Sequence, residues 1–185
     1  MSSNDSTAKT LTVALLLCIV CSVVVSTAAV MLKPAQEANK TLDRKRNILA
    51  AAGMLEPGKS IDEQFARVTS RMVDLRTGTF TDEVDVDSYD PRKAAKDPQL
   101  SSALAPEENV AGFARRENFA PVYLVNDSSG NIDKVILPVH GPGLWSTLYG
   151  FIALEADAKT VRGITYYQHG ETAGLGGEVD NPRWK

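Results

Sequence analysis

An apolar run near the amino terminus restricts this chain more than any other feature of its sequence. No charged residue occurs between Leu11 and Leu32. At about 1.5 Å of rise per residue, a helix of this length spans about 33 Å, which matches the hydrocarbon core of a bilayer. We therefore expect residues 11–32 to form a transmembrane helix that follows an N-terminal tail, residues 1–10.

A cleaved signal peptide is the alternative interpretation of this segment. Ser26 and Ala28 fit a cleavage site with small residues. However, the preceding region has Lys9 as its single basic side chain, partly offset by Asp5, and the apolar run continues beyond Ala28. Both features favour a retained anchor over a cleaved signal.

The charges beside the anchor bear on its orientation. Basic residues are concentrated after the helix, which by the positive-inside rule keeps the soluble part in the cytoplasm. Long domains can cross a membrane regardless of this bias. The basic residues are Lys33, Lys40, Arg44, Lys45 and Arg46.

The two cysteines, Cys18 and Cys21, both lie within the apolar run. A C-x-x-C spacing can bind metal, but no histidine or carboxylate lies nearby, so we expect no metal site. We interpret the cysteines instead as part of a stripe of small residues, which lets a second helix approach closely. Such a stripe predicts that the chain belongs to a larger membrane assembly. The stripe consists of Ala14, Cys18, Ser22 and Ser26.

Residues 33–60 are expected to be a helical stalk and linker. Pro34 permits a bend, and an amphipathic helix then runs to Gly53. Its pattern consists of Ala38, Leu42, Lys45, Leu49 and Ala52. Residues 54–60 read as a loop because they contain Glu-Pro-Gly.

The first half of the remaining segment, residues 61–185, gives weaker signals. A strand is expected within Ala66–Leu75, followed by a turn at Thr77-Gly78 and an acidic loop over Thr81–Asp90. Asp90-Pro91 is typical of an N-cap and first helical residue. A further helix is expected from Pro106 to about Glu117.

The second half reads as two consecutive β-hairpins. The apolar runs lie at Val122–Val125, Lys134–Val139, Thr147–Glu155 and Thr160–Gln168, with polar turns between the members of each pair. Hairpins flanked by helices predict an α+β domain with a mostly antiparallel sheet.

Two glycine-bearing segments lie at the ends of these strands, His140–Trp145 and Gly170–Glu178. Glycines let a backbone approach a planar ring or a phosphate, but ordinary tight turns explain them equally well. Neither segment is a G-x-G-x-x-G fingerprint, no Walker lysine motif occurs, and no basic stripe suggests nucleic acid as a partner. His140 and His169 lack ligand spacing, which favours a structural role over catalysis.

The chain resembles the C subunit of the bacterial sodium-translocating NADH:quinone reductase along its whole length. The residues that carry the resemblance are Ser26–Val30, Val135–Gly141, Gly143–Ser146, Ile164–Tyr167, Gly170–Glu178 and Asn181–Trp184. Family members usually have E-T-P-G-L-G in the Gly170–Glu178 loop, where Ala173 replaces the proline here. That change removes rigidity but no ligand group.

The resemblance implies an FMN-binding domain in residues 61–185, which relays electrons from NADH toward ubiquinone and so drives sodium export. It implies no independent catalytic activity. It also implies other membrane subunits as partners, a bacterial inner-membrane location and a periplasmic soluble domain. The periplasmic placement is favoured over the cytoplasmic one that the basic residues indicate, because a large domain can override the positive-inside bias.

The candidate cofactor-contacting residues all belong to the two glycine-bearing segments. Glu171 and Thr172 offer a carboxylate and a hydroxyl to a ribityl chain or ring edge, and Leu175 and Trp145 can pack on a flat ring. The full set is His140, Trp145, Glu171, Thr172, Gly174, Leu175 and Gly176. No catalytic residue and no metal ligand is expected.

One departure from the family concerns covalent attachment. In the family a flavin transferase joins the FMN phosphate to a threonine in an S/T-G-A-T motif. Thr77, Thr79, Thr147 and Thr172 all lack that context. We therefore expect this polypeptide to be a fragment whose domain lacks its C-terminal part, in preference to a natural truncation.

Two other functions remain open from the sequence. One is the G subunit of the related ferredoxin-linked electron-transport complex, which has a similar loop. The other is a membrane-anchored scaffold or sensor domain that binds no cofactor.

Overall fold

A computed structural model of the chain describes residues 6–107, 109–181 and 183. The chain divides into two compact units, Met1–Thr41 and Leu42–Lys185. The helix α1 (Thr7–Ala51) runs through the boundary between them. The boundaries predicted after residues 10, 32 and 60 remain predictions.

The first unit consists of the exposed part of α1. Among the described residues, α1 alone is long and apolar enough to cross a membrane. Thr12 and Thr27 donate their hydroxyls to the carbonyls of Ala8 and Val23, at 2.8 and 2.7 Å. Polar groups in an apolar stretch are thus bonded within the helix itself, as a lipid environment requires.

The expected stalk helix is the end of α1, and Pro34 lies inside one continuous helix. The predicted stop at Gly53 is confirmed. Gly53 has a φ of +66°. The N–H of Met54 donates to the carbonyl of Leu49 at 2.8 Å and that of Gly53 to Ala50 at 3.0 Å. These are the two bonds of a Schellman motif, which satisfies helix-end carbonyls.

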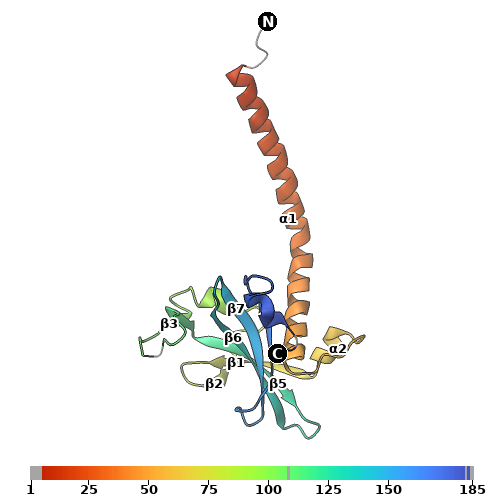
Figure 1. The fold of residues 1–185 in the computed structure, drawn as a ribbon, viewed down its shortest axis with the longest axis vertical. Helices are drawn as coiled ribbons and strands as arrows, with labels where there is room; N and C mark the ends of the chain where they lie inside the picture. The colour runs from red at the N-terminus through yellow and green to blue at the C-terminus, as the bar shows by residue number, and fades with distance from the viewer. Residues whose placement is uncertain (1–5, 108, 182, 184–185) are drawn as a thin grey trace. The chain divides into compact units, whose positions relative to one another are not determined.

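The second unit is an α+β domain built on a six-stranded antiparallel sheet (Figure 1). The strand order is β2-β1-β5-β6-β7-β8. The strands are β1 (Val68–Asp74), β2 (Thr79–Thr81), β5 (Phe119–Asn126), β6 (Ile132–Pro142), β7 (Thr147–Glu155) and β8 (Val161–Gln168). Both predicted hairpins are confirmed as β5–β6 and β7–β8, and the predicted α+β class is correct.

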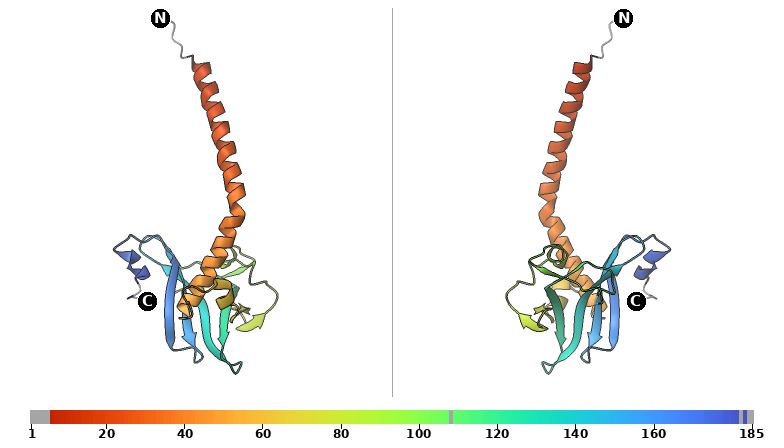
Figure 2. Two further views of the ribbon diagram at one scale, coloured as in Figure 1. Left: turned by 90° about the vertical axis from the view of Figure 1, so that its right-hand side faces the viewer. Right: turned by 90° about the vertical axis from the view of Figure 1, so that its left-hand side faces the viewer.

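One face of this sheet is covered by the last turns of α1 (Figure 2). Ile48 and Leu49 are 1% and 0% exposed and pack with Tyr123, Ile136 and Phe151 in one core. The short helix α2 (Ile61–Phe65) adds Phe65, whose ring lies edge-on to Tyr123 with centroids 6.4 Å apart. The end of the anchor helix is thus part of the hydrophobic core of the domain.

A second, smaller core joins the helix α3 (Pro91–Ala94) to the sheet. It contains Met72, Tyr89, Ala94 and Phe119. The hydroxyl of Tyr89 donates to the carbonyl of Phe119 at 2.9 Å. Burial raises the pKa of Tyr89 to about 12, so this hydroxyl stays a donor at physiological pH. The predicted start of α3 is confirmed, because Asp90 accepts from the N–H groups of Arg92 and Lys93.

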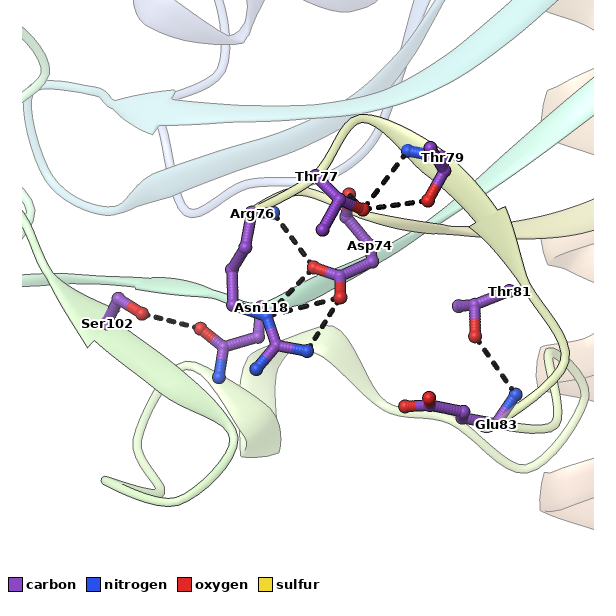
Figure 3. Close-up of polar contacts among 8 residues, drawn as sticks. All are labelled: Asp74, Arg76, Thr77, Thr79, Thr81, Glu83, Ser102 and Asn118. Atoms are coloured by element: carbon purple, nitrogen blue, oxygen red, sulfur yellow. Dashed lines mark hydrogen bonds and ion pairs between the residues drawn. The ribbon is translucent and has the colours of Figure 1, made fainter.

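The turn after β1 is held by an ion pair (Figure 3). Asp74 accepts from the main-chain N–H and the Nε of Arg76, both at 2.9 Å, and from its Nη2 at 2.6 Å. The Arg76 guanidinium holds the pKa of Asp74 below its usual range. Beside this pair, the buried Asn118 accepts from the hydroxyl of Ser102 at 2.7 Å.

The helix predicted from Pro106 to Glu117 is wrong for the described residues of that range. They form turns and the strand β4 (Arg115–Glu117), which pairs with β3 (Ser101–Ala103). The Arg115 side chain bonds the hydroxyl and the carbonyl of Ser101, at 2.8 and 2.6 Å. These partners lie 14 residues away in sequence. A local helical pattern therefore cannot predict them.

Candidate functional site

Two loops emerge side by side at one end of the sheet. The first, residues 143–146, joins β6 to β7, and the second, residues 169–175, connects β8 to the 3₁₀ helix η1 (Gly176–Asp180). Tyr149 on β7 pairs with Gln168 on β8. Because Tyr149 closely follows the first loop and Gln168 closely precedes the second, this pair brings the two glycine-bearing segments together.

Glu171 joins the second loop to the first. Its Oε1 accepts from the main-chain N–H groups of Trp145 and Ser146, at 3.1 and 3.2 Å, and its Oε2 from that of Leu144 at 3.3 Å. These N–H groups, led by that of Trp145, keep the pKa of the Glu171 carboxyl below its usual range. The ionised carboxylate therefore has partners within the protein.

Ser146 makes a second connection between the loops. Its carbonyl accepts from the N–H of Gly143 at 2.7 Å, which closes a tight turn. Its hydroxyl oxygen accepts from the N–H of Gly170 at 2.6 Å. Sequence reasoning did not single out Ser146, although it lies within the motif that carries the family resemblance.

Two glycines are required where the Glu171 side chain passes. A Cβ atom on Gly143 would lie 2.3 Å from Oε1 of Glu171 and 2.7 Å from the carbonyl oxygen of Ser146. A Cβ atom on Gly176 would lie 2.7 Å from Oε2 of the same carboxylate. At distances below 3.0 Å a neighbouring atom must shift. The main-chain carbonyl of Ser146 shifts less easily than the end of the Glu171 side chain, so the close approach is stricter at Gly143 than at Gly176.

Thr172 and Gly174 shape the second loop. The carbonyl of Thr172 accepts from the N–H groups of Leu175 and Gly177, at 3.1 and 3.0 Å. Gly174 has a φ of +75°, which residues other than glycine rarely adopt. The Thr172 side chain is left at the surface.

The joined loops present large apolar side chains to solvent. Leu144, Trp145 and Leu175 are 81%, 71% and 73% exposed. Leu144 and Trp145 belong to the first loop and Leu175 to the second, and Glu171 joins the two loops. Large exposed apolar side chains on joined loops are candidates for a binding surface. We call these three residues the apolar platform.

The two histidines have separate positions. His140 lies on β6, where its ring is 4.8 Å from that of Phe113 and 5.9 Å from that of Tyr149. His169 is closer to the carboxylate: its Nδ1 accepts from the N–H of Glu171 at 3.2 Å, and its Nε2 lies 2.7 Å from Asp180. The bond from Glu171 assigns the ring proton to Nε2, which donates to Asp180.

Two further predictions concern metals and the Asn181–Trp184 motif. Among the described residues, no group of three or more His, Cys, Asp or Glu is placed to hold a metal ion. Asn181 and Arg183 are described, with the N–H of Arg183 donating to Asn181 at 3.0 Å. Pro182 and Trp184 of the same motif lie outside the described residues.

Comparison with known proteins identifies the family and the fold. The model of the FMN-binding domain family matches residues 143–185, which contain both loops. The NqrC structure from Shewanella oneidensis superposes with a TM-score of 0.71 at 37% identity, covering 79% of this chain and 68% of that one. The C subunit of the Na⁺-translocating NADH-quinone reductase from Parabacteroides distasonis gives 0.62 at 26% identity, covering 83% and 66%.

Sequence relatives match along the whole chain. The C subunit of the Na⁺-translocating NADH-quinone reductase from Pseudomonas aeruginosa is 56% identical over an alignment of 189 residues, which covers 100% of this chain and 72% of the relative. The protein of the same name from Vibrio alginolyticus is 53% identical over 185 residues, with the same coverage. The chain therefore belongs to the family formed by the C subunits of the Na⁺-translocating NADH-quinone reductases.

Proposed function

We propose that this chain binds FMN on the apolar platform and relays electrons within the Na⁺-translocating NADH-quinone reductase. The observation that carries the proposal is the Glu171 carboxylate, which fixes residues 144–146 by three main-chain bonds. A loop fixed in this way can present Leu144 and Trp145 in a defined arrangement although both are exposed. The match of the FMN-binding domain family to residues 143–185 supports the same ligand.

The residues present fit a flavin in their chemistry. Trp145 and Leu175 offer exposed apolar surface on which a planar ring can pack. The Thr172 hydroxyl and the main chain of Gly174 offer polar contacts beside that surface, where no Cβ blocks the approach. Because the Glu171 carboxylate is bonded to main-chain N–H groups, its role is to position the first loop.

Bound FMN supplies the redox chemistry, and the chain supplies binding, orientation and access. Relaying electrons requires no general acid or base from the protein. The exposure of the platform suits a carrier, because partner subunits can then approach the group bound there. The chain accordingly acts as a subunit of an oxidoreductase complex, with no reaction of its own.

The membrane placement is part of the proposal. The apolar part of α1 anchors the chain in the bacterial inner membrane among other subunits, with lipid around it. The soluble domain lies on the periplasmic side. In the family a flavin transferase joins FMN to a threonine of an S/T-G-A-T motif, a context that Thr77, Thr79, Thr147 and Thr172 all lack. The residues of the two loops contribute the non-covalent contacts.

Binding of FMN to the full chain in detergent micelles tests the proposal. Trp145→Ala and Leu175→Ala should each weaken FMN binding by roughly tenfold or more, because each removes surface for ring packing. The matched control is Val161→Ala, which removes an apolar side chain of 55% exposure at the start of β8. Equal FMN affinity of all four proteins, measured by quenching of flavin fluorescence, would contradict the proposal.

A further inference from the structure

We propose that Arg92 is a positioning residue, which sets the separation of the two loops by clamping the strands from which they emerge. Its effect on FMN binding rests on the proposed function. Its effect on the loops themselves does not. Neither the sequence patterns nor the family resemblance pointed to this residue.

The pairing of β7 and β8 is irregular next to the loops. Gly150 pairs with Tyr166, whereas Tyr149 pairs with Gln168, so Tyr167 is an extra residue on β8. A bulge of this kind interrupts the ladder of main-chain bonds and lets the strand bend. The terminal pair, Tyr149 and Gln168, is separated from the rest of the ladder by this bulge, so contacts between side chains can add to its stability.

Arg92 gives that support to both strands at once. Its guanidinium carbon lies 3.5 Å from the centre of the Tyr149 ring on β7. Its Nη1 donates to Oε1 of Gln168 at 2.8 Å, and its Nη2 to the hydroxyl of Tyr167 at 3.1 Å. A planar guanidinium can stack and donate in two directions, which a lysine ammonium cannot reproduce.

The position of Arg92 is itself fixed by α3. Asp90 caps this short helix through the N–H groups of Arg92 and Lys93, at 3.0 and 3.4 Å. Ala94 is buried at 2% exposure in the second core. The clamp is thus attached to the folded domain, independently of the loops that it controls.

The stacking continues onto the third strand of this end. His140 on β6 lies beside Tyr149, with ring centroids 5.9 Å apart and planes at 27°. The Phe113 ring also contacts His140, with centroids 4.8 Å apart and planes tilted at 58°. The ring contacts among Phe113, His140 and Tyr149, together with the Arg92 contacts, therefore connect the ends of β6, β7 and β8, the three strands that adjoin the loops.

The clamp acts on the loops through short stretches of chain. Tyr149 lies three residues after Ser146, and Gln168 lies three residues before Glu171. The bonds from the N–H groups of residues 144–146 to Glu171 require the strand ends to stay at one separation. Releasing Arg92 should loosen these bonds without changing any residue of either loop.

The test measures amide hydrogen exchange of the full chain in detergent micelles, without FMN. Arg92→Gln should speed exchange at residues 144–146 by roughly tenfold or more, since two charge-assisted bonds and a stacked cation are lost. Arg92→Lys should not rescue the loops, because it restores the charge but not the planar fork. Gln168→Met should also speed exchange at residues 144–146. In the double variant Arg92→Gln/Gln168→Met, the effect on exchange should be smaller than the sum of the two single effects, because both remove the same bond.

The matched control is Arg71→Gln, because Arg71 also lies over a ring, that of Phe80 at 4.9 Å, but on β1. Unchanged exchange at residues 144–146 in Arg92→Gln would overturn the proposal, as would an equal change in Arg71→Gln. FMN affinity and the visible spectrum of bound FMN are then compared in the same variants. A wild-type chain that binds no FMN counts against the proposed function alone, whereas unaltered exchange counts against Arg92 alone.

Discussion

The Oε1 of Glu171 lies 3.1 Å from the main-chain nitrogen of Trp145, a residue 26 positions earlier in the chain. This bond, with those from Leu144 and Ser146, makes one carboxylate the point at which the two loops meet. The exposed Trp145 is therefore attached to a backbone that is fixed from the opposite loop. The predictions below depend on that relationship.

Replacing Glu171 by glutamine should separate the loops while leaving the fold intact. A glutamine presents an NH₂ group in place of one oxygen, so it cannot accept from all three N–H groups. We expect large amide chemical-shift changes at residues 144–146 and weaker FMN binding. The control is Glu178→Gln in η1, whose carboxylate accepts from the Asn181 side chain. Unchanged shifts in Glu171→Gln would contradict the assigned role.

The pH dependence of the loops follows from the same carboxylate. The folded pKa of Glu171 is lowered by the N–H groups, so its stabilising effect is fully present above the ordinary glutamate pKa, about 4.3. The effect is lost as pH falls through the lowered folded value. We expect the amide signals of residues 144–146 to be constant from pH 7 to about 5 and to change only in more acidic solution. Glu171→Gln should abolish that acid transition. A transition retained in the variant would assign it to another group.

Gly143 and Gly141 form a matched pair of glycines in one segment. Gly143→Ala places a methyl group against Glu171 and the Ser146 carbonyl, so we expect lower FMN affinity and altered Trp145 signals. Gly141→Ala meets no atom within 4 Å and should behave like the wild type. Titration with FMN, followed by fluorescence, compares the two. Equal affinities would show that the close approach at Gly143 is not needed.

The last turns of α1 should stabilise the soluble domain. Leu49 is fully buried in its core, so Leu49→Ala should lower the free energy of unfolding by about 2–5 kcal/mol. Leu42 is 40% exposed in the same helix, so Leu42→Ala should change the free energy of unfolding by less than about 1 kcal/mol. Denaturant unfolding of the two variants in micelles measures both values. A similar loss in both variants would mean that α1 does not pack specifically at Leu49.

Sequence reasoning succeeded where the signal is local. The uncharged run from Leu11 to Leu32 lies within α1, the predicted strand Thr147–Glu155 has the bounds of β7, and Asp90 caps α3. Each of these follows from hydropathy, alternation or capping within a few residues.

Contacts between distant residues were not accessible from such patterns. Residues 115–117 form a strand in place of the predicted helix, because they pair with Ser101–Ala103. Glu171 was predicted to be near a ligand, but its main-chain partners lie 25 to 27 residues away. Arg92 and Gln168 are 76 residues apart, so nothing local to either indicates the clamp.

The central claim is that FMN binds where Glu171 joins the two loops. The most direct test compares amide hydrogen exchange of the full chain, in detergent micelles, with and without saturating FMN. We predict that FMN slows exchange mainly at residues 143–146 and 170–177, around the apolar platform. Absence of any protection at these two loops, or protection confined to another part of the domain, would contradict the account.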